Sequence, residues 1–286
     1  MKRLFLLLLL ASLCMGLTFN ALAQQPKDIK KESIPMAMFQ ATYAFHFPAF
    51  DLKKDFGVSN TIGGSFIYKT ESNWLFTANG NFIFGNQLKG DRIDLFGEGI
   101  TTEYGEVTGG AGLYSTFAIY QRGMHFQAEV GKLFPIWPNP NSGLFVQAGV
   151  GYLRNRIKID FDNNTNNTPY VVYEEYEYGY DRMRGGPALH LETGYLYLGN
   201  ARIVNFSISF EVTYARNRDL RKYDFRVFHY SIDPETGERV RDPNGELFEP
   251  VGYTDSKKRY NDLYYGIRVS WNIPTYQRQP EEFYYN

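Results

Sequence analysis

Cysteine is almost absent from this sequence: one residue, Cys14, occurs among 286. Because it lies inside a predicted signal peptide, we expect the exported chain to contain none. Disulfides, a thiolate nucleophile and cysteine metal ligands are therefore excluded, although the compartment would permit disulfides. The chain also lacks an excess of charge of one sign, since it has 30 basic and 31 acidic residues and no cluster of basic residues stands out. That balance argues against electrostatic binding of nucleic acid.

The first 23 residues have the features of a signal peptide. Lys2 and Arg3 precede an apolar run over residues 4–17, and Ala21-Leu22-Ala23 forms a small-x-small cleavage site. One alternative is a retained membrane anchor, for which the apolar run is short. The other is a lipoprotein modified on Cys14, for which the preceding side chain, a leucine, is large.

Long hydrophobic runs are missing from the rest of the chain. No apolar stretch after residue 24 approaches the roughly 18 residues that a membrane helix requires, which excludes a helical membrane protein. Apolar side chains instead alternate with polar or small ones, as in a β-strand with one apolar face. The most regular example alternates Leu263, Tyr265, Ile267, Val269, Trp271 and Ile273 with Tyr264, Gly266, Arg268, Ser270 and Asn272.

Two kinds of fold produce such alternation. In a soluble sandwich or a lipocalin-like barrel the apolar faces form a core, and strands average about five to six residues. In a transmembrane barrel they face lipid, and strands need about nine to eleven residues. The segments here are of the longer kind, and their second face is rich in Gly, Ser, Thr and Asn, as suits a narrow interior. We therefore predict an all-β fold, an antiparallel transmembrane β-barrel.

The strand number follows less directly from the pattern. Nine segments alternate, at residues 37–47, 62–68, 74–84, 113–120, 124–130, 144–152, 189–197, 204–214 and 263–273. A bacterial barrel with both termini in the periplasm needs an even number. Either the segment over 36–47 lies outside the wall, which gives eight strands, or a further strand lies between Gly85 and Gly109, which gives ten. We favour eight.

Turn residues predict the domain organisation. Residues 70–73, 121–123 and 199–202 are expected to be tight hairpin turns. The long connections over 86–108, 161–182 and 218–259 are expected to face outward. The predicted arrangement is a signal peptide over 1–23, a periplasmic N-terminal segment over 24–35, a barrel over 36–273 and a periplasmic tail over 274–286.

Several short motifs of the predicted strands and connections are distinctive. They are Asn141-Ser142-Gly143, Gly149-Val150-Gly151-Tyr152-Leu153, Gly179-Tyr180-Asp181-Arg182, Arg202-Ile203-Val204-Asn205-Phe206, Leu263-Tyr264-Tyr265-Gly266 and Pro280-Glu281-Glu282-Phe283-Tyr284-Tyr285. With these motifs the chain resembles small outer-membrane β-barrel proteins of Gram-negative bacteria, and more narrowly a poorly characterised group found in bacteria with type IX secretion. The resemblance implies an outer-membrane location after signal-peptide cleavage, and recognition by the outer-membrane assembly machinery during insertion. The recognised signal would be either the strand over 265–273 or the terminal aromatic residues.

Ionisable residues on the polar faces of the strands could meet inside the barrel. The set favours a salt-bridged interior that plugs an eight-stranded barrel, because buried charges need partners. A proton relay, a metal site or a gate are the functional alternatives. The predicted network contains His125, Glu129, His190, Glu192, Glu211 and Arg268.

Motifs for catalysis, phosphate binding and calcium binding are missing after residue 24. The run from Asp160 to Asn164 resembles the start of a calcium loop, but Thr165 and Val171 occupy the positions that need Gly and Glu. We predict no catalytic residue, no cofactor and no metal ligand. A Tyr-rich connection is a candidate partner loop, although extended hairpins would use tyrosine equally well. Its members are Tyr170, Tyr173, Tyr176, Tyr178 and Tyr180.

Three classes of function remain. The favoured one is a non-enzymatic barrel that is a structural or accessory component of an envelope complex, for secretion or outer-membrane assembly. The second is a narrow pore for small solutes, which requires ten or more strands. The third is a hydrolase at the barrel rim, built on His229 with Asp224 or Asp233.

Overall fold

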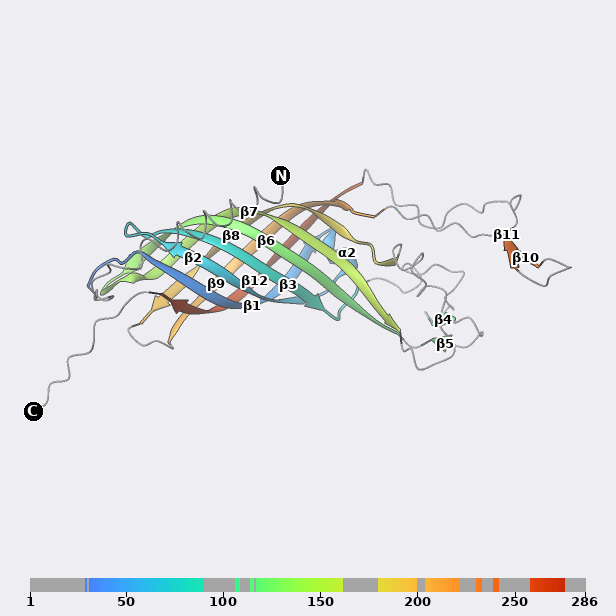
Figure 1. Cartoon of the computed structure of the whole chain (residues 1–286), viewed down its shortest axis with the longest axis horizontal. Coiled ribbons are helices and arrows are strands. Elements are labelled where there is room, and N and C mark those ends of the chain that lie inside the picture. Colours follow the sequence, from blue (N-terminus) through green and yellow to red (C-terminus); the bar gives the residue numbers. More distant parts are fainter. Residues whose placement is uncertain are drawn as a thin grey trace, which may run out of the picture.

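Eight long antiparallel strands close into a barrel (Figure 1). The structure is a computed structural model and describes residues 29, 31–89, 106–108, 114–115, 117–161, 180–199, 204–221, 230–232, 239–241 and 258–275. The order around the wall is β1-β12-β9-β8-β7-β6-β3-β2. The wall strands are β1 (Met36–Phe50), β2 (Ser59–Lys69), β3 (Trp74–Gly85), β6 (Phe117–Ile136), β7 (Asn139–Phe161), β8 (Arg184–Leu198), β9 (Asn205–Asp219) and β12 (Arg259–Pro274).

Short elements complete the described chain. They are one helix, α2 (Leu52–Asp55), and two small hairpins formed by β4 (Val107–Thr108) with β5 (Tyr114–Ser115) and by β10 (Tyr230–Ile232) with β11 (Arg239–Arg241). No helix in the described ranges is long and apolar enough to cross a bilayer.

The predicted eight strands are confirmed, but the proposed reason for eight is wrong. The segment over 36–47 is not outside the wall: it forms β1, which pairs with both β12 and β2 and closes the barrel. The ten-strand alternative is also wrong, because the barrel closes with eight strands. The strand β4, which lies between Gly85 and Gly109, pairs with β5 in a separate sheet.

The surplus segment arose because β6 was divided in two. The predicted turn over 121–123 lies in the middle of this strand, where Gly123 pairs with Ile83 on one side and Asn155 on the other. A Cβ atom at Gly123 would lie 2.6 Å from the Arg154 carbonyl oxygen and 2.5 Å from Asn155 Oδ1. This glycine therefore provides space for a close neighbour within a strand and does not form a turn.

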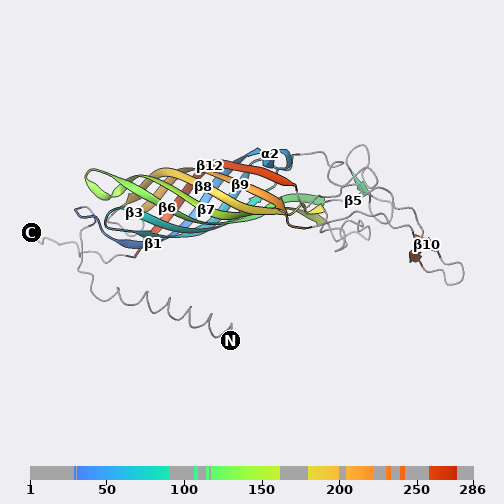
Figure 2. The ribbon, with the colours of Figure 1, turned by 90° about the horizontal axis from the view of Figure 1, so that it is seen from above.

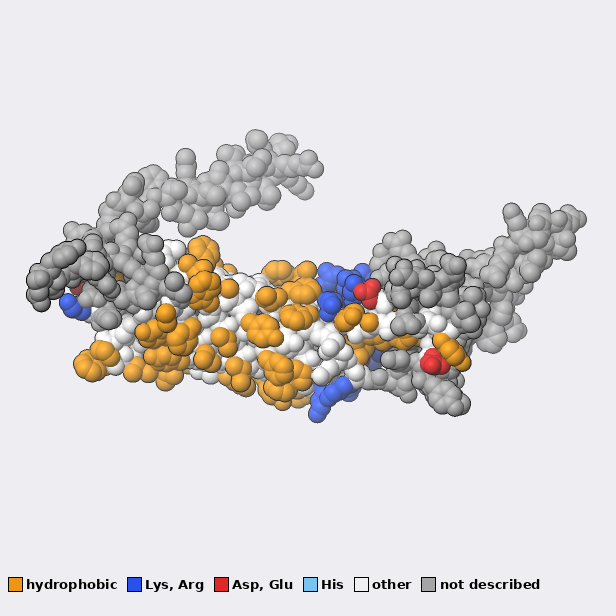
Figure 3. Space-filling view, turned by 90° about the horizontal axis from the view of Figure 1, so that it is seen from below, with side chains coloured by type: hydrophobic (Ala, Val, Ile, Leu, Met, Phe, Trp, Pro, Cys, Tyr) orange, Lys and Arg blue, Asp and Glu red, His pale blue; other side chains and the backbone are white. Residues whose placement is uncertain are grey.

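Alternation along each strand separates a lipid-facing wall from a polar interior. In β12, Ile267 is 57% exposed, whereas the next residue, Arg268, is 3% exposed. Figure 3 shows that hydrophobic side chains cover the middle of one face of the barrel. An exposed apolar wall around a closed sheet is the arrangement that a bilayer requires, because no strand edge is left unpaired. The fold is a transmembrane β-barrel.

The two ends of the barrel differ. At one end, the turn end, Asn73 donates its backbone N–H to the Thr70 carbonyl in the turn between β2 and β3, and the end of β8 pairs with the start of β9. The predicted turn over 199–202 lies mostly outside the described residues. The start of β1 and the end of β12 also lie there, with Met38 opposite Pro274. The opposite end, the loop end, carries α2 (Figure 2). The strands that flank the three predicted long connections end on this side.

Two buried apolar clusters occupy the interior, one at each end. Strand β3 contributes Leu75 to the first and Ile83 to the second, and three polar residues lie between them. The turn-end plug contains Ile29, Ile34, Met36, Met38, Ile67, Leu75, Leu133, Phe145, Leu196 and Leu198. The loop-end plug contains Leu52, Phe56, Ile83, Val107, Leu153, Ile157, Ala188, Ala215 and Tyr264.

The residues before β1 form part of the turn-end plug. Asn141 Oδ1 accepts a hydrogen bond from the Ile34 backbone N–H at 2.9 Å, and Asn141 Nδ2 donates to the carbonyls of Ile29 and Glu32, both at 2.7 Å. The buried Lys69 ammonium donates to the Ile34 carbonyl at 3.2 Å. Ile29 and residues 31–35, the described part of the predicted N-terminal segment, thus lie in the mouth of the barrel.

Replacing Asn141 with alanine is expected to release this segment. The change removes three hydrogen bonds and leaves a buried N–H and two carbonyls without Asn141, at a cost of about 1–3 kcal/mol of local stability. Hydrogen–deuterium exchange at the Ile34 amide should accelerate by about 5- to 150-fold, the factor that corresponds to this cost. Asn261→Ala, at the loop end, is the control and should leave this amide protected. Unchanged exchange in Asn141→Ala would show that the apolar contacts alone hold the segment.

Candidate functional site

All six residues of the predicted network lie in the barrel interior between the two plugs. Their exposed fractions range from 1% for Glu211 to 6% for His125. Strand alternation explains this placement, because each of these residues has lipid-facing neighbours on either side along its strand. They come from four strands: His125 and Glu129 from β6, His190 and Glu192 from β8, Glu211 from β9 and Arg268 from β12.

The structure adds His46 of β1 to this network. Its Nε2 hydrogen-bonds to Glu211 Oε1, and both side chains are buried. The sequence carried a signal for it, since His46 has the same alternation phase as Thr42, which also faces the interior. The signal could not be used while β1 was expected to lie outside the wall.

Glu211 is the best neutralised carboxylate of the network. Arg268 Nη2 lies 2.6 Å from its Oε2, and His46 contacts its other oxygen. A buried carboxylate needs such partners, because an unpaired charge in the low-dielectric interior would be costly. Arg268 also lies near a second carboxylate, with its Nη1 3.9 Å from Glu192 Oε2.

His190 lies between the carboxylates. Its Nδ1 is 2.8 Å from Thr213 Oγ1. Its Nε2 is 3.8 Å from Glu129 Oε1, 3.8 Å from Glu192 Oε2 and 3.7 Å from Glu211 Oε2. These separations exceed hydrogen-bond length, so Nε2 faces three carboxylates and donates to none of them.

Neutral polar groups hold the outer side of this cluster. Glu129 Oε1 accepts hydrogen bonds from Asn79 Nδ2 at 2.5 Å and Gln127 Nε2 at 2.6 Å, and Glu192 Oε1 accepts one from Ser209 Oγ at 2.5 Å. The His125 ring packs edge-on against His190, with 5.9 Å between centroids. The network therefore has three carboxylates, three imidazoles and one guanidinium, an arrangement that can hold protons or a cation.

Comparisons with known proteins identify no family. No family model matches the chain, and no curated protein matches it. Ail, the attachment invasion locus protein of Yersinia pestis, solved with the heparin analogue sucrose octasulfate, is 10% identical, with 83% of this chain and 98% of Ail covered and a TM-score of 0.36. Neisserial surface protein A is 12% identical, with 82% and 96% covered and a TM-score of 0.32. Because these TM-scores are low, the barrel assignment depends on the strand pairing of this chain itself.

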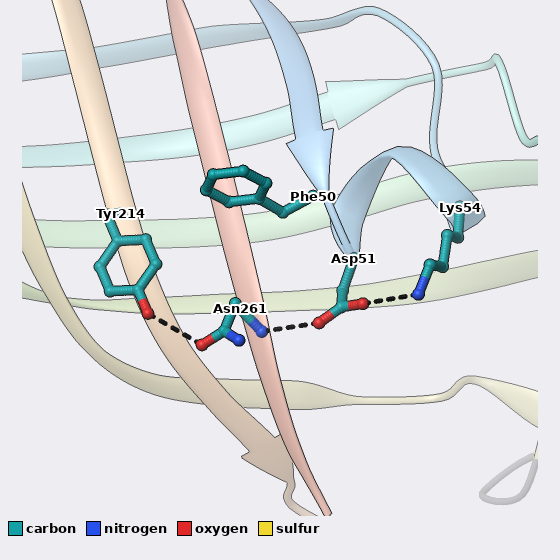
Figure 4. Close-up of a pocket in the computed structure, with 5 residues that line it drawn as sticks. All are labelled: Phe50, Asp51, Lys54, Tyr214 and Asn261. Carbon is teal, nitrogen blue, oxygen red and sulfur yellow. Dashed lines mark hydrogen bonds and ion pairs between the residues drawn. The ribbon is translucent and has the colours of Figure 1, made fainter.

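A second polar site, which the sequence did not reveal, lies on the outer wall at the loop end (Figure 4). It is an open pocket of about 440 Å³ lined by Phe50, Asp51, Lys54, Tyr214 and Asn261. Asp51 accepts hydrogen bonds from Lys54 Nζ at 2.8 Å and from the Asn261 backbone N–H at 2.9 Å. The Lys54 hydrogen bond lowers the pKa of Asp51 below its usual value. The two hydrogen bonds of Asp51 connect α2 to the barrel rim.

Other sequence candidates lie mostly outside the described residues. Tyr170, Tyr173, Tyr176 and Tyr178 of the predicted partner loop are among these, and so is His229 of the predicted rim hydrolase. Tyr180 is described: it is half-buried and packs against the loop-end plug. Asp160 is exposed and lies 3.4 Å from the Lys158 ammonium.

Proposed function

We propose that this chain is a non-enzymatic outer-membrane β-barrel that serves as a structural or accessory component of an envelope complex, in secretion or in outer-membrane assembly. The observation that carries the proposal is the filled interior. The two plugs and the network between them occupy the inside of an eight-stranded wall. A barrel of this size has an interior just wide enough for its own side chains. We therefore expect the protein to act through its outer surfaces.

Both mouths of the barrel are held closed by side-chain interactions. Asn141 and Lys69 hold the N-terminal segment at the turn end. At the loop end, Asp55 of α2 pairs with Arg184 of β8, and Arg184 also stacks on the Tyr260 ring at 3.7 Å. These contacts argue against the narrow pore, because a solute would have to break them at both ends.

Basic residues on the outer wall support a defined position in the membrane. They continue the lipid-facing side of β6, β7, β9 and β12 beyond the apolar belt, toward the loop end, and Figure 3 shows Lys and Arg side chains there. Cations at this height attract anionic lipid headgroups. The loop end would then project from the membrane. The residues are Arg122, Arg154, Arg156, Lys158, Arg216, Arg218 and Arg259.

Crosslinking in intact cells, followed by purification of the tagged protein from gently solubilised membranes, tests the proposal. We expect one or more defined partner proteins in stoichiometric amounts. Recovery of the barrel as an uncrosslinked monomer would contradict a role in an envelope complex.

A loop variant sharpens this experiment. Tyr170, Tyr173, Tyr176 and Tyr178 are replaced together by serine, and Tyr180 is retained because it packs against the loop-end plug. If these tyrosines dock the partner, crosslinks are lost while the variant still migrates as a folded, heat-modifiable barrel. If crosslinks persist in full, the partner binds another surface and the loop assignment is wrong.

A further inference from the structure

Strand register brings Glu129 and His190 together across β7. Glu129 of β6 pairs with Gly149 of β7, and Gly149 pairs on its other side with His190 of β8. A Cβ atom at Gly149 would lie 2.6 Å from Glu129 Cγ. The missing side chain therefore allows the carboxylate and the imidazole to approach each other over the strand between them. Glu192, two residues after His190, faces the interior on the same strand.

These three side chains form a compact set of possible metal ligands. One atom from each, an imidazole nitrogen and two carboxylate oxygens, lies within 4.8 Å of the others, and all three residues are buried. Zinc ligands at bond lengths of about 2.0–2.2 Å lie roughly 3.4 Å apart in a tetrahedral site. The 3.8 Å separations around His190 Nε2 are close to that spacing.

An unpartnered polar atom points into this set. His190 Nε2 faces the carboxylates of Glu129 and Glu192, and it is buried with no hydrogen-bond partner among the residues that the structure describes. Thr213 Oγ1 can accept the Nδ1 proton of His190, which leaves the lone pair on Nε2. A histidine held at one nitrogen by an oxygen, with the other nitrogen facing carboxylates, has the arrangement of a metal ligand and its supporting hydrogen bond.

The charge distribution favours a cation at the same place. Arg268 and His46 both contact Glu211, so that carboxylate is neutralised. Glu129 has only the neutral amides of Asn79 and Gln127 as hydrogen-bond partners among the described residues. Glu192 Oε2 lies 3.9 Å from Arg268 Nη1, and the same guanidinium contacts Glu211 more closely. The carboxylates of Glu129 and Glu192 thus face the His190 imidazole with little positive charge nearby. A divalent ion at this place would neutralise both carboxylates.

We propose that Glu129, His190 and Glu192 bind one divalent first-row transition metal ion inside the barrel. One nitrogen and two carboxylate oxygens suit Zn²⁺, with Asn79, Gln127, Ser209 and Thr213 orienting the ligands. Since both mouths are plugged, the ion enters as the barrel folds and exchanges slowly afterwards. The role is structural, goes beyond the proposed surface function and is independent of partner binding.

Refolding of the full barrel into detergent with equimolar Zn²⁺, followed by desalting and metal analysis, tests the site. We expect one zinc per chain, retained after brief exposure to EDTA, and a higher unfolding temperature than for protein refolded in EDTA. Refolding with Co²⁺ should give visible absorption bands of a low-symmetry site. A zinc content near zero in a folded, heat-modifiable barrel would overturn the proposal.

Matched variants locate the ion. Thr213→Val should lose about 10–100-fold in zinc affinity. Glu129→Gln and Glu192→Gln keep the size of the side chain and one oxygen acceptor, and each should lose more affinity than Thr213→Val because a direct ligand is changed. Asp262→Asn changes another buried interior carboxylate in the same way and should retain one zinc. Equal zinc content in Glu129→Gln and Asp262→Asn would place the ion elsewhere and contradict the assignment. Crosslinked partners are unaffected by either result, so the two proposals fail separately.

Discussion

Replacing Arg268 with methionine is expected to lower the free energy of unfolding of the barrel by about 3–5 kcal/mol. Methionine fills a similar volume but removes the guanidinium that contacts Glu211 at 2.6 Å and lies near Glu192. The buried carboxylates would then keep their desolvation cost without this cation. Urea unfolding in detergent micelles, followed by tryptophan fluorescence, measures the change.

The double variant Arg268→Met, Glu211→Gln is the control for this prediction. It removes the carboxylate together with its partner, so its loss of stability should be smaller than that of Arg268→Met alone. If Arg268→Met costs less than about 1 kcal/mol, the interior is hydrated enough to screen the charges. The description of the interior as filled by its own side chains would then be wrong.

Replacing Ile267 with arginine is expected to cost about 2–4 kcal/mol of barrel stability in a lipid bilayer. Ile267 is 57% exposed on the outer wall and lies near the middle of the apolar part of β12. Strand alternation directs the side chain at this position toward lipid, so an arginine there would place its charge in hydrocarbon. Reversible unfolding of the barrel from liposomes measures the cost.

Ile273→Arg is the matched control for Ile267→Arg. It lies on the same face of the same strand, but at the turn end of the apolar belt, where the cost should fall to about 0–1 kcal/mol. Equal costs at the two positions would mean that the wall does not span hydrocarbon as inferred. The gradient between them therefore maps the depth of the strand in the membrane.

Which side chains face lipid and which face the interior could be predicted from the sequence. The alternation around Ile267 and Arg268 determines this locally, because successive side chains of a strand point to opposite faces. The six residues of the interior network were found in this way. Local patterns failed at Gly123, where a glycine that provides space for a neighbouring strand cannot be distinguished in sequence from a glycine in a turn.

The sequence by itself therefore determined an all-β membrane wall, its apolar outer face and the residues of its polar interior. Only the tertiary structure decided that residues 36–47 close the barrel, that the segment around Ile34 plugs one mouth and that His46 joins the network. It also decided that Glu129 and His190 meet across Gly149. The physical reason is that strand alternation is a property of neighbouring residues, whereas register and packing across the barrel depend on residues far apart in the chain.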